Sequence, residues 1–333
     1  MGAHEHKIIE RHRAYLARGM IKQAFVLGAG LGTRLRPLTD DVPKPLMPIF
    51  QKPLITFALD HLIAAGVERF VINTHHLAGQ LEAFFATGAY RDRPIQLVNE
   101  SDLLETGGGI KNAETLLGHH PFIVYSGDIL TDIDIEQLVA EHVRRGNEVT
   151  LALRKTNFAA GVVFAEGRVL DITRGGAGQE SNYDYANVSV WNPDIFARIP
   201  VATKVSFIPI LVEWIRQGGR IGGLVLEEGQ WFNIGSRAEY LEVHRTIART
   251  RWKPAYVSDR EWPLSVARSA VVEPGARLTG CTVIGEKCRI ESGARLDDTI
   301  VWAGAQIASR SDLAGCIVRT QEKVEGTHRN TDL

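Results

Sequence analysis

The sequence predicts an α/β protein with a doubly wound, mixed but mostly parallel sheet, followed by a smaller C-terminal domain of short repeats. Apolar runs of strand length alternate with segments of helical periodicity in the first half of the chain, which indicates a parallel sheet covered by helices. An apolar residue recurs every six positions between residues 272 and 302, which indicates a repeat architecture. The length of 333 residues accommodates one large and one small domain.

The alternation is clear after residue 50. Residues 53–66 place apolar side chains at helical spacing, residues 67–73 read as a strand, residues 80–85 begin a second helix, and residues 95–98 form the next strand. Ligands of doubly wound sheets bind beyond the carboxyl ends of the strands. The loops that follow the strands are therefore the candidate binding segments.

Charge and cysteine content narrow the possible partners and location. The chain carries 38 basic and 39 acidic residues, and this net charge of −1 argues against bulk binding to nucleic acid or to anionic membranes. The three cysteines, Cys281, Cys288 and Cys316, cannot form a complete disulfide framework, which favours a reducing compartment. Neither a signal peptide nor an apolar run of about 18 residues is evident, so we expect a cytoplasmic protein.

The most informative stretch is residues 27–48, LGAGLGTRLRPLTDDVPKPLMP, which follows an apolar run. Glycines alternate at Gly28, Gly30 and Gly32. A strand that feeds a glycine-rich turn brings backbone N–H groups close to phosphate, because no Cβ blocks the approach. The spacing fits neither the G-x-G-x-x-G fingerprint nor the P-loop pattern.

Cations follow these glycines. Arg34 offers a planar guanidinium and Lys44 a mobile point charge, whereas we expect Arg36 to form an ion pair within the loop. The whole run, GxGTRLRPLT followed by PKPL, resembles the signature of the sugar-1-phosphate nucleotidyltransferases, also called nucleotide-sugar pyrophosphorylases. The resemblance extends through most of residues 20–245.

This resemblance implies a Rossmann-like fold, an NTP (GTP or UTP) and a sugar 1-phosphate as substrates, and Mg²⁺ as cofactor. The sugar phosphate would attack the α-phosphorus of the NTP and expel pyrophosphate, with Arg34, Lys44 and Asp128 as catalytic residues. Two glycine-containing stretches would hold the base and phosphates of the NTP: Leu27, Gly28, Ala29, Gly30, Gly32, Thr33, Thr106, Gly107 and Gly108. In the second stretch, LETGGGIKNA, Thr106, Gly107 and Gly108 can present backbone groups to the flat ring of the base, and residues 110–117 are expected to form a helix. A plain helix-entry turn is the alternative.

Metal binding is expected at two positions. Asp128 ends an apolar strand pattern, FIVYSGD, and matches the family's metal-binding aspartate. The second family aspartate, in the pattern W-x-D-x-G-T, is replaced here by Asn233. An amide oxygen still binds Mg²⁺, but without the negative charge of a carboxylate.

The sugar side of the expected site also departs from the family pattern. Gly161 resembles a sugar-side glycine, whereas Asn187 stands where glycine is usual. The Glu-Lys-Pro of many members is absent from residues 169–178, where Arg174 offers the nearest cation. Asn187 is expected to reshape the sugar pocket.

The sequence leaves the substrate open. LETGGGIKNA is most similar to N-acetylmuramate-1-phosphate uridylyltransferases, whereas the arrangement of two domains resembles mannose-1-phosphate guanylyltransferases. We favour guanylyl transfer because the domain arrangement involves more residues. A non-catalytic nucleotide-sugar sensor is the contrasting interpretation, motivated by Asn187, Asn233 and the missing Glu-Lys-Pro.

The C-terminal part resembles the hexapeptide repeat of left-handed parallel β-helices. Its apolar positions are Val272, Leu278, Ile284, Ile290, Leu296 and Trp302, and the register slips near Ile307 and resumes at Leu313. Three repeats form one coil, so we expect roughly two coils. Such a short β-helix usually serves assembly, which predicts a homo-oligomer, and the three cysteines become core or near-core residues. An acyltransferase site is disfavoured, because His328 is the one histidine beyond residue 244.

These observations predict five segments. They are an N-terminal extension (1–19), a catalytic domain (20–251), a linker (252–263), a left-handed β-helix (264–320) and a polar tail (321–333).

Overall fold

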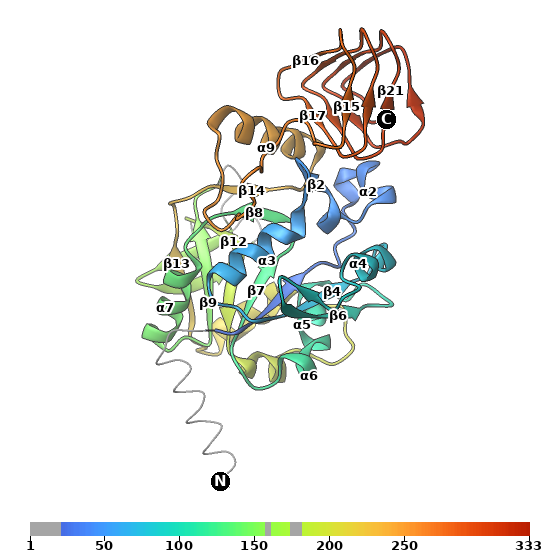
Figure 1. Ribbon diagram of the computed structural model, residues 1–333. Helices are drawn as coiled ribbons and strands as arrows, with labels where there is room; N and C mark the ends of the chain where they lie inside the picture. Colours follow the sequence, from blue (N-terminus) through green and yellow to red (C-terminus); the bar gives the residue numbers. More distant parts are fainter. Residues whose placement is uncertain (1–20, 157–160, 174–181) are drawn as a thin grey trace. The chain divides into compact units, whose positions relative to one another are not determined.

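The structure is a computed structural model that describes residues 21–156, 161–173 and 182–333 (Figure 1). The predicted N-terminal extension and Arg174 lie outside the described residues. The chain forms two compact units: the first runs to Leu31 and resumes over Ala58–Trp231, and the second combines Gly32–Phe57 with Phe232–Leu333. These units do not coincide with the predicted domains, because residues 32–57 group with the C-terminal part of the chain.

A ten-stranded sheet forms the centre of the first unit, in the order β10-β11-β13-β9-β12-β7-β1-β4-β6-β5. Its strands are β1 (Gln23–Leu27), β4 (Arg69–Thr74), β5 (Ala89–Tyr90), β6 (Arg93–Asn99), β7 (Phe122–Ser126), β9 (Val149–Arg154), β10 (Val162–Ala165), β11 (Arg168–Ile172), β12 (Asp184–Trp191) and β13 (Ile221–Val225). The four strands β7, β1, β4 and β6 run parallel, whereas β12 is antiparallel to both β7 and β9. The predicted mixed sheet with a parallel core is confirmed.

Helices follow the strands as predicted. The helical segments of the whole chain are η1 (Thr33–Leu35), α2 (Leu38–Asp41), η2 (Lys44–Leu46), α3 (Leu54–Ala64), α4 (Ala78–Phe84), α5 (Glu105–Asn112), α6 (Glu114–Leu117), α7 (Ile135–Arg145), η3 (Pro193–Arg198), α8 (Phe207–Arg216) and α9 (Arg237–Thr250). Two short strands, β8 (Ile129–Thr131) and β14 (Trp231–Asn233), lie outside the large sheet.

Local signals explain why these helices begin and end where they do. In α7, the Asp134 side chain accepts a 2.8 Å hydrogen bond from the backbone N–H of Gln137, and Gly146 ends the helix in the left-handed region. The main core of the unit packs α5 and α8 against the strands: Phe207, Leu211 and Trp214 of α8 join Phe122 and Trp191 in one buried cluster. Such apolar burial stabilises the fold by roughly 1.5–3 kcal/mol per large side chain.

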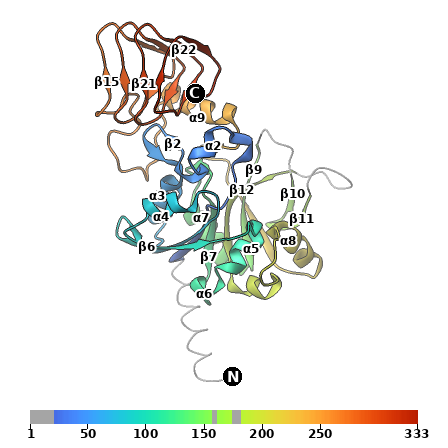
Figure 2. The same ribbon diagram turned by 90° about the vertical axis from the view of Figure 1, so that its right-hand side faces the viewer.

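The C-terminal strands form three parallel sheets, as in a left-handed β-helix, and their coils lie stacked on one another (Figure 2). The first sheet contains β15 (Val271–Val272), β18 (Arg289–Ile290), β21 (Gln306–Ile307) and β24 (Lys323–Val324); the second contains β16 (Arg277–Thr279), β19 (Arg295–Asp297), β22 (Asp312–Ala314) and β25 (Thr327–Arg329); the third contains β17 (Val283–Ile284), β20 (Ile300–Val301) and β23 (Ile317–Val318). The predicted repeat domain is therefore confirmed.

The predicted number of coils is wrong, because sheets of four, four and three strands form nearly four coils rather than two. Two further details of the predicted repeat are also corrected. Ile284 is in register with Val301, so Val301 rather than Trp302 fills the interior of that coil. The strands β24 and β25 also continue the β-helix into the predicted polar tail, where Val324 is the buried residue. The sequence conceals both features, because one residue is missing from the six-residue spacing after Leu296 and a single valine marks the last coil.

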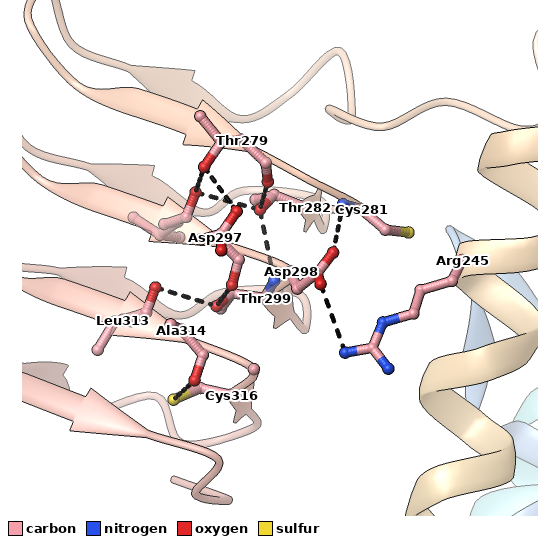
Figure 3. A network of polar contacts seen from close by, with 12 residues as sticks. Arg245, Thr279, Cys281, Thr282, Asp297, Asp298, Thr299, Leu313, Ala314 and Cys316 are labelled. Carbon is pink, nitrogen blue, oxygen red and sulfur yellow. Dashed lines mark hydrogen bonds and ion pairs between the residues drawn. The ribbon is translucent and has the colours of Figure 1, made fainter.

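The third sheet presents apolar residues outward as well as inward. Ile284, Val301 and Val318 face the interior, yet Val283, Ile300 and Ile317 are buried too. Polar contacts join this side of the β-helix to α9: Arg245 forms a 3.5 Å ion pair with Asp298, which lies in a network of stacked turn residues (Figure 3). The buried outer face explains why α9 groups with the repeat domain.

The segment 48–57 groups with the second unit through α9 and the predicted linker. Strands β2 (Pro48–Ile49) and β3 (Lys52–Pro53) form a hairpin. The backbone N–H of Phe50 donates to His244 Nε2 at 3.0 Å, and the indole N–H of Trp262 donates to the carbonyl of Ile49 at 3.0 Å. Among the described residues, no helix is long and apolar enough to cross a membrane.

Candidate functional site

The glycine-rich turn after β1 is fixed by two buried polar residues, one near the end of β4 and one directly after β6. The backbone N–H of Gly28 donates to Asn73 Oδ1 at 2.9 Å, and Asn73 Nδ2 donates to Glu100 Oε1 at 2.8 Å. The other carboxylate oxygen of Glu100 accepts from the N–H of Leu104 at 2.9 Å, just before α5. Gly30, by contrast, is exposed, and a Cβ there would meet nothing within 4 Å. The turn is therefore anchored at Gly28 and open at Gly30, as a phosphate-binding turn requires.

The sequence did not reveal Asn73 and Glu100 as members of this site. Asn73 is the penultimate residue of β4 and Glu100 directly follows β6, and both are almost fully buried. Buried polar side chains are usually hydrogen-bonded, and here each holds a loop at the carboxyl edge of the sheet. A polar residue at or just after the end of a predicted strand was the available signal.

The helix of the second glycine stretch begins earlier than predicted, at Glu105 rather than Ile110, so the glycines themselves are helical. Helix α5 begins at Glu105, and the N–H groups of Gly107 and Gly108 donate to the carbonyl of Val205 at 2.8 and 3.0 Å. A Cβ on Gly108 would lie 2.4 Å from the carbonyl oxygen of Thr203. These glycines let the segment before α8 approach closely, and their N–H groups are already bonded within the protein.

A cavity of about 350 Å³ lies in the first unit and is lined by several predicted site residues. Leu27, Thr106, Gly161 and Asn187 all border it. The other lining residues combine hydroxyl, carboxylate and aromatic groups: Ser126, Val162, Ile172, Thr173, Asp184, Tyr185, Ser206, Phe207 and Ile208. The structure thus gathers residues from both the nucleotide-side and the sugar-side predictions around one space.

Asn187 occupies a bulge in β12. The register with β9 shifts between Tyr185 and Ser189, and Asn187 has φ = 61°. This left-handed region favours glycine, and asparagine tolerates it better than most residues do. The backbone therefore explains why asparagine stands at a position where the resembling family has glycine.

Tyr185 is held rigidly beside this bulge. Its hydroxyl lies 2.8 Å from Ser189 Oγ, which also accepts a 2.6 Å hydrogen bond from the indole N–H of Trp191. Burial raises the pKa of the Tyr185 phenol well above its usual range, so the group is neutral. Asp184, the neighbouring residue, contributes the one carboxylate among the described residues of the lining.

Asp128 comes directly after the turn that ends β7. The N–H of Gly127 donates to the carbonyl of Leu27 at 2.9 Å, and a Cβ on Gly127 would lie 2.8 Å from that oxygen. This close approach ties the loop carrying Asp128 to the end of β1. Among the described residues, no group of three or more His, Cys, Asp or Glu side chains could hold a metal ion.

Ala29 is buried in the first unit, and the remaining predicted residues lie in the second unit. Gly32 adopts φ = 63° and precedes η1, where Thr33 and Arg34 are exposed, whereas Lys44 is buried in η2. Arg36 forms a 3.3 Å ion pair with Asp40, which confirms the predicted pairing within the loop.

The side chains of Asn233 and Arg34 both approach Gly235 in this unit. A Cβ placed on Gly235 would lie 2.8 Å from Arg34 Nη2 and 3.1 Å from Asn233 Nδ2. Asn233 Nδ2 donates to Glu239 Oε1 at 3.4 Å. Glu239 was also missed from the sequence, although Ser236 and Glu239 have the spacing of a capping box at the start of α9.

Asp128 and Asn233 have the donor chemistry that a hard divalent cation takes. One offers carboxylate oxygens and the other an amide oxygen, and Mg²⁺ prefers few protein oxygens together with substrate phosphates. The hydrogen bond from Asn233 Nδ2 to Glu239 leaves the amide oxygen of Asn233 as its metal-binding atom. Each of the two residues therefore offers an oxygen of the kind that such an ion takes.

Comparison with known proteins gives a consistent result. The family model for nucleotidyl transferases matches residues 23–250. The chain is 31% identical over 302 residues to mannose-1-phosphate guanylyltransferase of Mycobacterium tuberculosis, covering 89% of this chain and 82% of the relative. It is 34% identical over 241 residues to N-acetylmuramate alpha-1-phosphate uridylyltransferase of Caulobacter vibrioides, covering 68% of this chain and 97% of that relative. A third relative, the mannose-1-phosphate guanylyltransferase catalytic subunit beta of Danio rerio, is 28% identical over 319 residues, with 89% and 85% covered.

Proposed function

The chain belongs to the nucleotidyl transferase family, and on this basis we propose that it transfers a nucleotidyl group from an NTP to a sugar 1-phosphate, forming an NDP-sugar and pyrophosphate. The observation that carries this proposal is the joint presence of the anchored glycine turn and the adjoining cavity. Gly30 offers an exposed, uncrowded backbone to phosphates, and Leu27 at the start of the same turn lines the cavity.

Guanylyl transfer to a mannose-type sugar is the preferred assignment. The two relatives named for mannose 1-phosphate align with 89% of this chain, which includes much of the β-helix. The relative named for N-acetylmuramate 1-phosphate aligns with 68% of this chain, although 97% of that relative is included in the alignment. Uridylyl transfer is the second candidate, because the identity to that relative, 34%, is at least as high over the shared part.

The reaction requires positioning and charge neutralisation rather than a general base. The attacking phosphate oxygen of the sugar 1-phosphate is already an anion, and it displaces pyrophosphate from the α-phosphorus in line. Gly28, Gly30 and Gly32 border the phosphates of the NTP, Arg34 stabilises the leaving pyrophosphate, and Lys44 bridges the reacting phosphates. Fixed cations of this kind lower the energy of a transition state in which negative charge spreads over the phosphoryl oxygens.

Asp128 and Asn233 would hold Mg²⁺, consistent with the general use of a divalent metal in this family. The bound ion would neutralise phosphate charge. Asn233 supplies an oxygen without a negative charge, so we expect weaker attraction of the ion than in a site with two carboxylates.

The cavity beside Asn187 is the proposed place of the sugar. Its hydroxyl and carboxylate groups, from Thr173, Asp184 and Ser206, can hydrogen-bond a polyol, and Tyr185 and Phe207 provide aromatic surface. The base would lie against Leu27 and Thr106 at the other side of the lining.

The second unit supports two further proposals, one on the assembly of the protein and one on its location. The β-helix leaves strand edges open at its two ends, and we assign it the role of joining copies of this chain into a homo-oligomer. All three cysteines are free thiols, two of them buried in the β-helix, which suits a reducing compartment such as the cytoplasm.

The test is pyrophosphate release by the purified protein with Mg²⁺, across the four NTPs and a panel of sugar 1-phosphates. Release that depends on GTP and mannose 1-phosphate supports the preferred assignment, and release with UTP and N-acetylmuramate 1-phosphate supports the second candidate. Binding of nucleotide sugars without release from any pair would instead identify a sensor, and the proposed catalysis would be abandoned.

A further inference from the structure

We propose that Glu239 is a positioning residue for the reaction: one carboxylate holds both Asn233 and the Gly235–Ser236 turn, and so fixes the surroundings of Arg34. The catalytic consequence of this inference rests on the proposed function, whereas the contacts of Glu239 are independent of it.

The carboxylate of Glu239 makes more contacts than a helix cap needs. In a capping box, the Ser236 hydroxyl accepts from the N–H of Glu239, and this hydrogen bond is present at 3.3 Å. Glu239 Oε2 also accepts from the N–H of Gly235 and from the Ser236 hydroxyl, each at 2.9 Å. Oε1 is directed instead to the side chain of Asn233, at 3.4 Å. The last contact adds nothing to the helix and acts on the predicted metal-binding amide.

The guanidinium of Arg34 and the carboxylate of Glu239 both lie close to Gly235. From the position that a Gly235 Cβ would occupy, Arg34 Nη2 is 2.8 Å away and Glu239 Oε2 is 3.2 Å away. The carboxylate of Glu239 therefore lies near the guanidinium of Arg34 and attracts it electrostatically, without a direct ion pair between the two described side chains. Gly235 leaves room for both groups, which explains why a residue without a side chain is needed there.

This arrangement accounts for asparagine at position 233. A carboxylate at that position would face the carboxylate of Glu239 within hydrogen-bonding distance, and like charges so close repel one another. An amide avoids the repulsion and donates to Glu239 instead. The contact between these two side chains thus carries one negative charge, on Glu239.

The anchor of this arrangement is the β-helix. Arg237, the first residue of α9, donates to Asp332 Oδ1 at 2.6 Å and to the carbonyl of Gly315 at 2.7 Å. Helix α9 therefore begins at a fixed place, two residues before Glu239. Through these contacts the β-helix fixes the start of α9 and, with it, the position of Glu239.

An exchange of side chains tests the proposal. In Glu239→Gln, the new amide can still accept from Gly235 and Ser236, but its NH₂ group faces the NH₂ group of Asn233. The double variant Asn233→Asp with Glu239→Gln restores one donor and one acceptor with the same net charge. The matched control is Glu242→Gln, on the same helix, whose carboxylate contacts Thr246 and Arg249.

Two measurements do not require turnover. The side-chain amide resonances of Asn233, identified by their loss in Asn233→Asp, should shift in Glu239→Gln and remain in place in Glu242→Gln. Binding of inorganic pyrophosphate, measured by calorimetry, should weaken about tenfold in Glu239→Gln, which is the scale of the charge-assisted hydrogen bond that Asn233 loses, and should recover in the double variant. Thermal unfolding of each variant shows whether the fold is retained.

Turnover then gives the catalytic consequence. We expect kcat to fall more than KM rises in Glu239→Gln and to recover in the double variant. Unmoved Asn233 resonances, or a double variant no better than the worse single variant, would overturn the role of Glu239. If wild-type protein releases no pyrophosphate from any substrate pair, the proposed function fails, whereas the resonances and pyrophosphate binding still decide the role of Glu239.

Discussion

The indole N–H of Trp302 donates a 3.0 Å hydrogen bond to the hydroxyl oxygen of Tyr240, and that hydroxyl donates in turn to the carbonyl of Pro48 at 2.6 Å. One buried phenol thus links the β-helix, α9 and the hairpin that follows Lys44. The three segments are far apart in the sequence, and this link helps to make them one unit.

Replacing Tyr240 by phenylalanine tests the strength of this link. The variant leaves a buried indole N–H without its acceptor and a carbonyl without its donor, so we expect a loss of about 1–3 kcal/mol in the free energy of unfolding. Urea denaturation of wild type and variant measures the difference. The control Tyr183→Phe changes a half-buried tyrosine of the other unit, and it should change stability much less; equal losses would contradict the role assigned to Tyr240.

Acid should destabilise the protein through His244. This histidine is fully buried, accepts from the N–H of Phe50 and lies 2.8 Å from the carbonyl of Tyr240, and burial lowers its pKa from 6.5 to about 4. Between those values the unfolded chain binds a proton that the folded chain does not. The stabilising contribution is therefore complete above pH 6.5 and is lost as the pH falls towards 4, by up to roughly 3 kcal/mol.

The measurement is the free energy of unfolding as a function of pH. His244→Gln removes the titrating group while retaining one donor and one acceptor, so its stability should depend less on pH between 6.5 and 4. His61, also buried with its pKa lowered to about 4, should contribute a second slope of the same sign. The control His119→Gln, on the surface, should keep the wild-type pH dependence.

Asn187→Gly should separate backbone strain from sugar recognition. Because residue 187 has φ = 61°, glycine is expected to maintain stability or raise it by up to about 1 kcal/mol. The loss of an amide from the cavity lining should raise KM for the sugar 1-phosphate and leave KM for the NTP nearly unchanged. Steady-state kinetics with each substrate varied in turn, together with thermal unfolding, provides the check; a larger effect on the NTP would move Asn187 out of the sugar site.

Arg34→Ala and Asp128→Ala should each reduce kcat at least about 100-fold, on the scale of lost charge stabilisation in a transition state. Arg36→Ala is the matched control, since Arg36 is paired with Asp40 in the same loop and should reduce kcat only slightly. Near-normal turnover in either of the first two variants would refute the catalytic assignment.

Features set by local sequence were predictable. The glycine turn after β1, the apolar periodicity of the helices and the six-residue repeat all depend on neighbouring residues. The pairing of Arg36 with Asp40, four positions away on one short segment, is of the same kind.

Features set by distant partners were not predictable. The glycines of α5 read as a loop because their purpose depends on Val205, almost 100 positions later, whose carbonyl binds their N–H groups. Asn187 read as an unexplained departure, whereas the backbone at the bulge in β12 accounts for it. The hydrogen bond from Asn233 to Glu239 depends on the turn at Gly235, and the hydrophobic pattern of the sequence does not predict the geometry of that turn.

The two-segment make-up of the second unit has a consequence for how the protein forms on the ribosome. Residues 32–57, which carry Arg34 and Lys44, emerge early, yet the partners that hold them begin at Phe232. At a synthesis rate of roughly 5–20 residues per second, this segment waits on the order of ten seconds for α9 and longer for the last coils. During that interval the hairpin of β2 and β3 lacks its partners from the second segment and is accessible to chaperones. Arg34 and Lys44, the proposed phosphate-binding cations, reach their final surroundings only after α9 has been synthesised.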